Sequence, residues 1–317
     1  MEYIKVTQAA EKWGISTRRV RVLCVEGKIP GVIRKGNLYM IPVNAPKPLD
    51  GRKTRAGMLA EIEAKRERLS EMPPLTPGEV KQLRKEFMIE FTYNSNAIEG
   101  NTLTLKETAM VLEGVTIDQK PLKEHLEAVG HRDAFLYVED IAKQKLPLSE
   151  YVIKSIHSLV LMNQPEDKGI YRRIPVRIMG AYTEPVQPYL IEPKINKLLT
   201  VNEERKEGMN PIERIARFHL EFEGIHPFID GNGRTGRLIM NLDLIRGGYP
   251  PINVKFTDRK KYYDAFDVYY RDGDAGAMTD LIAGYVNERL DEYLKILSTG
   301  ECNAVNIVDT NLCEIKG

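Results

Sequence analysis

The twelve residues that decide the fold of this 317-residue chain form one unbroken, glycine-rich stretch. They read His226-Pro227-Phe228-Ile229-Asp230-Gly231-Asn232-Gly233-Arg234-Thr235-Gly236-Arg237. Before them, apolar residues recur at helical spacing from Pro211 onward, and after them a second helical pattern ends at Gly247-Gly248. We therefore expect a loop that joins two helices.

The second half of this stretch has the composition of an anion site. Gly231, Asn232 and Gly233 allow successive backbone N–H groups to turn toward one point at the start of a helix, where the helix dipole is positive. Arg234 and Arg237 lie three residues apart, so both guanidinium groups can reach the same polyanion. The pattern predicts a site for phosphate groups.

The first half supplies two further chemical groups. Asp230 places a carboxylate beside the predicted phosphate site, where the usual role of a carboxylate is to hold Mg²⁺. His226 could take a proton from an incoming hydroxyl group near neutral pH. Taken singly, the glycines could simply form a turn between helices, and the histidine could be a core or surface residue. Phe228 and Ile229 are expected to be core residues that fix the loop. Taken together, the residues indicate phosphoryl or nucleotidyl transfer.

The complete stretch resembles, without a gap, the HPFxDGNGRxxR signature of the Fic family of adenylyltransferases. The resemblance implies that His226 deprotonates a Ser, Thr or Tyr hydroxyl group, which attacks the α-phosphate of ATP. It assigns Mg²⁺ to Asp230, the β-phosphate to Arg234 and the γ-phosphate to Arg237. The nucleotide-binding residues that it implies are Gly231, Asn232, Gly233, Arg234, Thr235, Gly236 and Arg237.

A second informative stretch lies upstream of the motif. Thr76 and Glu79 have the spacing of a capping box, so a helix is expected over residues 77–99. Ser95 and Glu99 are four residues apart and share a face of that helix. Because the helix dipole disfavours a glutamate in the last turn, Glu99 should have a cationic partner or remain in water.

Residues 95–100 also resemble the [S/T]xxxE[G/N] inhibitory motif that many Fic proteins carry. The resemblance implies that Glu99 pairs with Arg237 and so denies this arginine to the γ-phosphate of ATP. The chain is then expected to be a class II member, inhibited by its own N-terminal helix. A solvated glutamate beside a helix end is the alternative.

Residues 176–182 alternate as a strand does and are expected to turn near Gly180. Fic proteins have a β-hairpin flap at this place, which pairs with the backbone of the target. The resemblance implies that Met179, Gly180, Ala181 and Tyr182 face the nucleotide. A surface hairpin without a function is the alternative.

Tyr262 and Tyr263 lie in another expected helix, which Thr257 caps. This segment resembles the part of Fic domains that borders adenosine, so both tyrosines are candidates for packing against the base and the ribose. Core positions explain tyrosines at helical spacing equally well. Tyr270 occupies the position at which the family often has an asparagine that reaches adenine.

The N-terminal residues 1–45 have the pattern of a small DNA-binding unit. Helices are expected over Gln8–Trp13 and Thr17–Val25, followed by a two-stranded wing that turns at Gly36-Asn37. The unit resembles the winged helix-turn-helix of MerR-type and excisionase-type proteins, whose second helix enters the major groove of DNA. A basic module that binds another protein is the alternative. The expected DNA-contacting residues on the second helix are Arg18, Arg19 and Arg21.

Charge and composition agree with this organisation. Residues 1–55 carry 12 Lys and Arg against 4 Asp and Glu, whereas the whole chain has a net charge of +1, so the N-terminal end favours a polyanionic partner. The three cysteines lack metal-binding spacing, and no apolar run approaches 18 residues. We expect a cytoplasmic protein with no membrane segment.

The expected architecture is mainly α, with a Fic-type helical domain, a β-hairpin flap and a small N-terminal winged helix-turn-helix. Its predicted divisions are residues 1–45 for the winged unit, 46–57 for a linker, 58–298 for the Fic domain and 299–317 for a tail.

The predicted activity is AMP transfer from ATP, with Mg²⁺, to a target protein or to the chain itself, restrained by Glu99 and compatible with a homodimer. Two alternatives remain open: a transcriptional regulator that uses the Fic pocket as an ATP sensor, and an enzyme that removes AMP.

Overall fold

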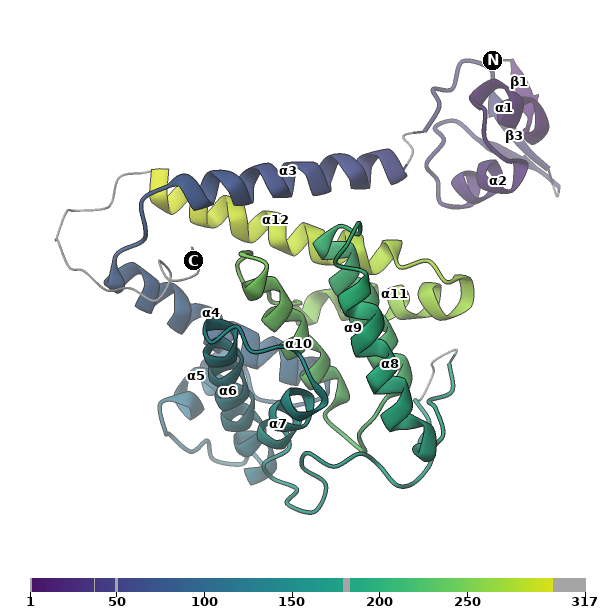
Figure 1. Ribbon diagram of the computed structural model, residues 1–317. Helices are drawn as coiled ribbons and strands as arrows, with labels where there is room; N and C mark the ends of the chain where they lie inside the picture. Colours follow the sequence, from purple (N-terminus) through teal and green to yellow (C-terminus); the bar gives the residue numbers. More distant parts are fainter. Residues whose placement is uncertain (1, 37, 49–50, 179–182, 299–317) are drawn as a thin grey trace. The chain divides into compact units, whose positions relative to one another are not determined.

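The computed structural model describes residues 2–36, 38–48, 51–178 and 183–298 (Figure 1). The chain divides into two compact units, Met1–Met58 and Leu59–Gly317. Helices dominate both units, and the sheet is confined to the first, so the protein is mainly α as the sequence predicts. Among the described helices, none combines the length and the apolar character that crossing a bilayer requires.

The N-terminal unit consists of two short helices and a three-stranded antiparallel sheet. Strand β3 lies between the other two, with Ile41 opposite Ile4 of β1 and Tyr39 opposite Arg34 of β2. The sequence pattern does not predict β1, because three residues are too few for alternation to be visible. The elements of this unit are β1 (Tyr3–Lys5), α1 (Val6–Trp13), α2 (Thr17–Val25), β2 (Ile33–Lys35) and β3 (Leu38–Pro42).

Helix α1 begins two residues before the predicted start at Gln8. The reason is a cap: the Gln8 side chain accepts a hydrogen bond of 2.9 Å from the backbone N–H of Lys5. Gly14 then ends α1 with a φ of +64°, and Ser16 caps α2 by accepting from the backbone N–H of Arg19 at 3.2 Å. The turn thus packs the apolar faces of the two helices together around Trp13.

The second unit consists of helices joined by loops. Helix α3 starts at Gly51, before the boundary of the two units, so it includes seven of the twelve residues of the predicted linker 46–57 and begins seven residues before the expected Met58. The elements are α3 (Gly51–Glu71), α4 (Pro77–Ile98), α5 (Leu105–Leu112), α6 (Leu122–Lys143), α7 (Glu150–Val160), η1 (Pro188–Leu190), α8 (Ile191–Glu204), α9 (Pro211–Ile225), α10 (Asn232–Arg246), η2 (Phe256–Asp258), α11 (Arg259–Asp272) and α12 (Gly276–Ser298).

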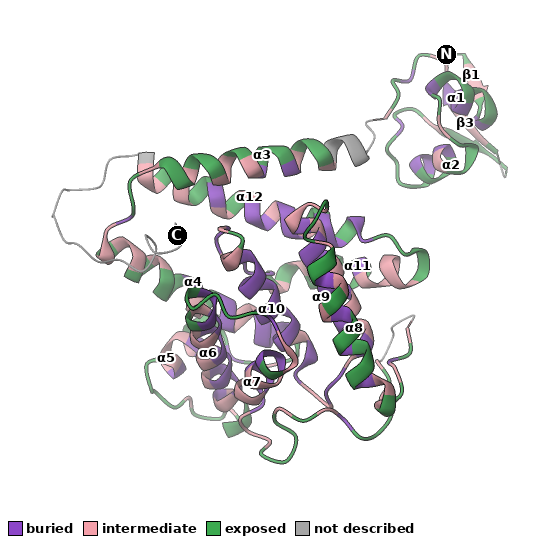
Figure 2. Ribbon diagram, viewed as in Figure 1, coloured by how far each residue is buried: buried purple, intermediate pink, exposed green. Residues whose placement is uncertain are grey.

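Helix α10, which carries the second half of the motif, is the centre of this unit. Figure 2 shows it buried along most of its length, and it packs against α6, α7 and α9. Leu238, Ile239 and Leu242 have no exposed surface and join the largest apolar cluster, which α4, α6, α7, α8 and α9 complete. A helix that is enclosed in this way gives the motif a rigid support.

Helix α4 brings Glu99 to the start of α10. Thr76 and Glu79 form the predicted capping box, in which the Thr76 N–H donates to the Glu79 carboxylate at 2.8 Å. The helix ends at Ile98, Glu99 is its C-cap and Gly100 follows with a φ of +95°. Glutamate at this position is disfavoured by the helix dipole unless a cation compensates it.

The structure describes the predicted flap only on either side of its expected turn. Residues 173–178 and 183–187, on either side of the expected turn, form no strand. Met179, Gly180, Ala181 and Tyr182 lie outside the described residues, as do residues 299–317. The described part of the flap therefore departs from the expected β-hairpin.

Candidate active site

His226 lies at the end of α9 in a backbone conformation that is rare for a side chain of its size. Its φ is +50°, and its backbone N–H donates to the carbonyl of Phe222 at 3.1 Å, which ends the helix. Burial lowers the pKa of His226, and Arg172 lowers it further. His226 is therefore neutral near pH 7 and has a nitrogen that can accept a proton.

Arg172 holds the backbone around His226, a role that the sequence does not reveal. Its guanidinium group donates to the carbonyl oxygens of His226 at 2.8 Å, Ile174 at 3.0 Å and Val186. The backbone N–H of Arg172 donates to the carbonyl of Pro227 at 3.0 Å. Only 5% of Arg172 is exposed, so these bonds fix both the end of α9 and the two edges of the flap.

Asn232 fixes the motif loop from the other side. Its side-chain oxygen accepts from the backbone N–H of Phe228 and its nitrogen donates to the carbonyl of Phe228, both at 2.9 Å. The side chain thus spans the loop from Asn232 back to Phe228, using its oxygen and one of its two N–H donors.

His157, on α7, is a second loop-fixing residue that the sequence does not identify. Its ring stacks on Phe228 with centroids 3.6 Å apart. Nδ1 accepts from the Gly169 N–H at 2.9 Å, so Nε2 carries the proton and donates to the Asp230 carbonyl at 2.9 Å. Burial lowers the pKa of His157 to about 4, and a neutral ring is what this pair of bonds requires.

The start of α10 has the geometry of an anion site, and a carboxylate lies in it. Gly231 precedes the helix with a φ of +75°. A β-carbon on Gly233 would overlap Oε1 of Glu99, so the Glu99 side chain covers the first turn of the helix. Arg237 donates to Glu99 Oε1 at 2.7 Å, to Ser95 Oγ at 2.9 Å and to the Ser95 carbonyl at 2.8 Å. The predicted pair between Glu99 and Arg237 is therefore present.

Arg234 has carboxylates on two sides. Its guanidinium group lies 3.4 Å from Asp230 of the loop and 3.4 Å from Glu127 of α6, which the sequence analysis did not identify. Burial tends to raise the pKa of Asp230, but Arg234 and the N–H of Gly231 lower it overall, so this carboxylate is ionised. Asp230 keeps 42% of its side chain exposed and can take a cation.

Thr235 and Gly236 face the core and do not line the loop. Thr235 is fully buried, and a β-carbon on Gly236 would lie 2.5 Å from Oε1 of Glu223 and 2.9 Å from the ring of His219. Gly236 thus permits the close packing of α10 on α9.

The structure separates the two candidate tyrosines. Tyr262 is 2% exposed, and its hydroxyl group lies 2.7 Å from Nε2 of His219 and 3.4 Å from Arg237, so it belongs to the core beneath the site. Tyr263 is 45% exposed and donates to the carbonyl of Ile98, so its ring is the more accessible of the two. Tyr270 donates to the carbonyl of Leu220 and packs on Gly224.

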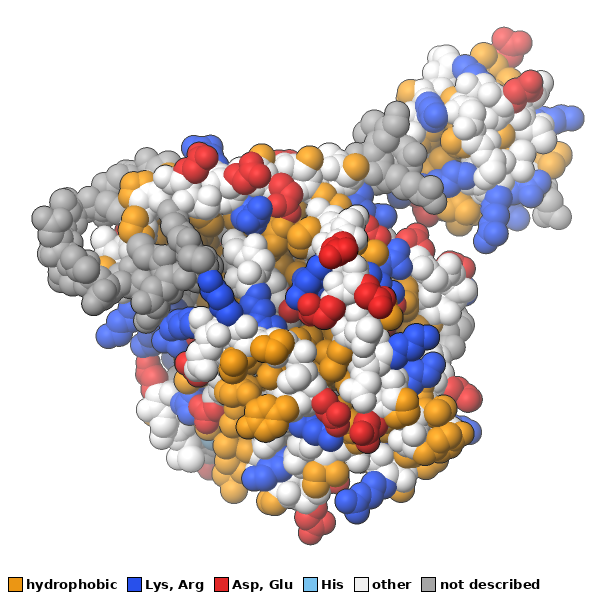
Figure 3. Space-filling model, in the orientation of Figure 1, with side chains coloured by type: hydrophobic (Ala, Val, Ile, Leu, Met, Phe, Trp, Pro, Cys, Tyr) orange, Lys and Arg blue, Asp and Glu red, His pale blue; other side chains and the backbone are white. Residues whose placement is uncertain are grey.

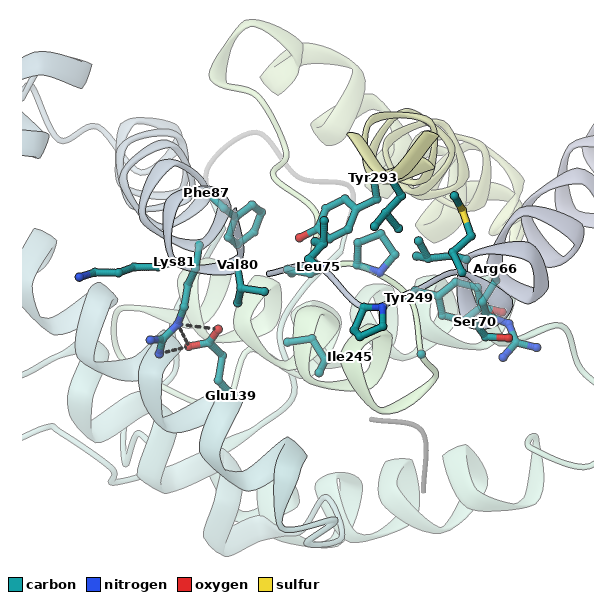
Figure 4. Close-up of a pocket in the computed structure, with 18 of the residues that line it drawn as sticks. Arg66, Ser70, Leu75, Val80, Lys81, Phe87, Glu139, Ile245, Tyr249 and Tyr293 are labelled. Carbon is teal, nitrogen blue, oxygen red and sulfur yellow. Dashed lines mark hydrogen bonds and ion pairs between the residues drawn. The ribbon is translucent and has the colours of Figure 1, made fainter. Parts of the chain in front are cut away.

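A large cavity lies away from this site. It has a volume of about 660 Å³ and is lined by apolar residues that include Leu75, Ile245 and Tyr249, with the ion pair of Arg84 and Glu139 at its rim (Figure 4). None of the residues from His226 to Arg237 lines it.

Comparisons with known proteins place the motif in a family. The Fic/DOC family model matches residues 147–244. The chain is 34% identical over 239 residues to the protein adenylyltransferase Fic of Drosophila melanogaster, covering 74% of this chain and 48% of that protein. It is 32% identical over 237 residues to the protein adenylyltransferase fic-1 of Caenorhabditis briggsae, covering 74% and 46%. The chain spans about half the length of the curated relatives it matches.

Two solved structures share the helical arrangement. Fic-1 from C. elegans has a TM-score of 0.70 at 28% identity, covering 79% of this chain and 74% of that chain. A Fic-domain-containing signalling protein from Bacteroides thetaiotaomicron has a TM-score of 0.70 at 26% identity, covering 78% of this chain and all of that chain. With the motif in the loop between α9 and α10, this chain contains a domain of the Fic/DOC family.

Proposed function

We propose that this protein transfers AMP from ATP to a hydroxyl group of a protein, with His226 as the base and Glu99 as an internal inhibitor. The observation that carries the proposal is the ion pair of Glu99 with Arg237 at the start of α10. A buried arginine at a helix N-terminus is suited to a phosphate group, and here a carboxylate takes that place. The relatives named protein adenylyltransferases support the same chemistry.

The proposed reaction uses groups that the site already positions. His226 takes the proton of a Ser, Thr or Tyr hydroxyl group, whose oxygen bonds to the α-phosphorus of ATP. The bond from this phosphorus to the bridging oxygen breaks, and pyrophosphate leaves. In this proposal the backbone N–H groups in the first turn of α10 and the side chain of Arg234 balance the charge on the phosphates.

Asp230 fits the role of a Mg²⁺ ligand. Its carboxylate is ionised and partly exposed beside the anion site, and Mg²⁺ commonly binds one or two carboxylates together with substrate phosphates and water. Among the described residues, no group of three or more His, Cys, Asp or Glu side chains could hold a metal. A bound Mg²⁺ would offset negative charge on the phosphates, and Asp230 would orient it.

The inhibition follows from competition for one site. Ser95 and Glu99 occupy the donors of Arg237, and the Glu99 carboxylate covers the turn at Gly233. A γ-phosphate cannot pair with Arg237 in the same way until Glu99 moves. The free energy of breaking this pair is thus added to the cost of binding ATP in a productive pose.

Intact-protein mass spectrometry tests the proposed chemistry. Incubation of Glu99→Gly with ATP and Mg²⁺ should add the mass of AMP to the protein, and label from the α-phosphate of ATP should be retained while label from the γ-phosphate is not. Retention of γ-label would indicate phosphoryl transfer instead. The absence of any adduct, on the protein or on lysate proteins, would contradict the proposal.

We further propose that the N-terminal unit binds DNA. Arg18 and Arg21 are exposed on α2 and Arg19 is half-buried, while Arg34 and Lys35 are exposed on the wing strand β2. Figure 3 shows Lys and Arg side chains on the surface of this unit. Such side chains pair with phosphates of the DNA backbone, and the sheet supplies the wing of a winged helix.

Salt dependence of DNA binding tests this second proposal. Replacing Arg18 and Arg21 by Gln should weaken binding of duplex DNA. The slope of log affinity against log salt concentration should also become less steep, by the amount expected for the loss of about two phosphate contacts. The matched control is Lys260→Gln with Lys261→Gln, which removes two charges from exposed residues of α11. Equal salt slopes for both double variants would contradict DNA binding through α2.

A further inference from the structure

Glu223 is a buried carboxyl group next to the base, and the reaction described above does not use it. It lies one turn before His226 on α9, only 8% exposed, and its Oε2 is 3.9 Å from Nδ1 of His226. Nδ1 of His226 is itself buried and has no hydrogen-bond partner, and neither has Oε1 of Glu223. Oε2 of Glu223 thus lies just beyond hydrogen-bonding distance of Nδ1, and each of the two side chains has a buried atom without a partner, which is a costly arrangement.

The surroundings hold Glu223 against the motif helix. A β-carbon on Gly236 of α10 would lie 2.5 Å from Glu223 Oε1, so the carboxyl group rests on the backbone of that helix. His219 of α9 packs on the same glycine and lies 2.7 Å from the Tyr262 hydroxyl group. Tyr262 in turn accepts from Arg237 at 3.4 Å. The side chain of Glu223 is thus held in a buried position between α10 and the end of α9.

A histidine that acts as a base at the end of α9 needs a hydrogen-bond acceptor for its second ring nitrogen. To take a proton on Nε2, a neutral histidine must carry its own proton on Nδ1, and that N–H must be satisfied inside the protein. The backbone of His226 is already fixed by Arg172, so only the ring orientation and the tautomer remain to be set. Two acceptors of Glu223 are near the ring: its backbone carbonyl, whose hydrogen bond tends to raise the pKa of His226, and its carboxyl group, which can accept from Nδ1–H after a small side-chain movement.

We propose that Glu223 is a positioning residue for His226: its carboxyl oxygen accepts the Nδ1–H of the ring and so presents an unprotonated Nε2 to the target hydroxyl group. The inference rests on the proposed AMP transfer. During the reaction the proton of the target hydroxyl group moves to Nε2 of His226, and Nδ1 keeps its proton. No proton passes to Glu223, which stabilises the imidazolium that forms.

The charge state of Glu223 is compatible with this role. Burial raises the pKa of Glu223 to about 8, Glu99 also raises it, and Arg237 lowers it. The carboxyl group is thus largely protonated near pH 7, and its carbonyl oxygen can still accept a hydrogen bond. A glutamine, which has the same shape and the same acceptor, should therefore replace it well.

The experiment compares three side chains at position 223 in the active background Glu99→Gly. Glu223→Gln keeps the acceptor, whereas Glu223→Met keeps the approximate volume without one. We expect Gln to retain kcat for AMP transfer within about threefold, and Met to lower kcat at least about thirtyfold with the KM for ATP changed less than about threefold. Thermal unfolding of each variant shows whether it is folded.

A tautomer measurement separates this inference from the proposed function. Two-bond ¹H–¹⁵N spectra of histidine-labelled protein, with His226 identified by its absence in His226→Ala, report which nitrogen of His226 is protonated. We expect Nδ1–H in the parent and in Glu223→Gln, and a mixture of tautomers in Glu223→Met. If Gln and Met behave alike in kcat and in tautomer, Glu223 is only a packing residue. If the tautomers differ as expected while no variant transfers AMP, the proposed function fails and the positioning contact stands.

Discussion

The Glu99 carboxylate covers the first turn of α10 at Gly233, where a β-carbon would overlap its Oε1. From the same place it accepts a hydrogen bond of 2.7 Å from Arg237. The N–H groups at the start of α10 and the guanidinium group of Arg237 form one anion site, and a carboxylate and a phosphate cannot occupy it together. The proposed function therefore predicts that ATP binding and the Glu99 contact are coupled.

Removing the charge of Glu99 should strengthen ATP binding. In Glu99→Gln the side chain keeps its size but loses the ion pair, so we expect the Kd of a non-hydrolysable ATP analogue to fall about tenfold or more by calorimetry. Glu113→Gln is the matched control, because Glu113 is the C-cap of α5 and pairs only with Lys85 across the surface. An affinity that rises equally in both variants would mean that overall charge, and not the site, is responsible.

Replacing Arg172 by Lys should impair the base without abolishing the fold. Arg172 reaches the carbonyl oxygens of His226, Ile174 and Val186 from three separate nitrogens of a planar guanidinium group, and a compact ammonium group cannot reproduce that spread, so the end of α9 loses its fixed position. We expect kcat for AMP transfer in the Glu99→Gly background to fall about tenfold to a hundredfold, since small displacements of a base are costly. The KM for ATP should change little, and a change confined to KM would argue against the orienting role.

Adding a methyl group at Gly236 should destabilise the protein. The new β-carbon would lie 2.5 Å from Glu223 Oε1 and 2.9 Å from the His219 ring, so these two buried side chains must shift. We expect a loss of about 1–3 kcal/mol in the free energy of unfolding, measured in urea. Gly284→Ala in α12, where no atom lies within 4 Å, should instead stabilise by about 0.5–1 kcal/mol.

The buried histidines should make the protein sensitive to acid. His157 is neutral in the fold with a pKa of about 4, while in the unfolded chain its pKa is about 6.5. The folded value is the lower one, so the unfolded chain binds the proton first, and stability is lost as the pH falls from about 6.5 to 4. At pH 5 the protonation of His157 should lower the free energy of unfolding by about 2 kcal/mol.

Denaturation in urea at pH 7 and pH 5 checks this value. His157→Gln removes the titrating ring and is expected to be less stable at pH 7, because the stacking on Phe228 is lost. Between pH 7 and pH 5, the free energy of unfolding of this variant should fall by about 2 kcal/mol less than that of the parent. The same pH dependence in both proteins would show that other groups cause the acid sensitivity.

Local sequence patterns predict the helices and the main contact of the site well. The start of α4 follows from the spacing of Thr76 and Glu79, and α2 has the predicted bounds Thr17–Val25, because caps are short-range interactions. The motif predicts the loop between α9 and α10, and the resemblance predicts the pairing of Glu99 with Arg237. In each case, neighbouring residues or a complete motif carry the information.

The long-range contacts are not predictable in this way. Arg172, His157 and Glu127 reach the loop from three other segments, and nothing near them in the sequence distinguishes them from surface residues. The inward orientation of Thr235 and Gly236 depends on the complete burial of α10, which a helical period does not reveal. Packing around the motif decides which of its residues remain available to a ligand.

The most direct test of the account is the initial rate of α-labelled AMP transfer in the wild type, Glu99→Gly, and Glu99→Gly with His226→Ala. We expect the rate to rise about tenfold or more when Glu99 is removed, because Arg237 becomes free for the γ-phosphate. Loss of His226 should return it to background, since the base is gone. Equal rates in the wild type and Glu99→Gly, or a rate that survives the loss of His226, would contradict the account.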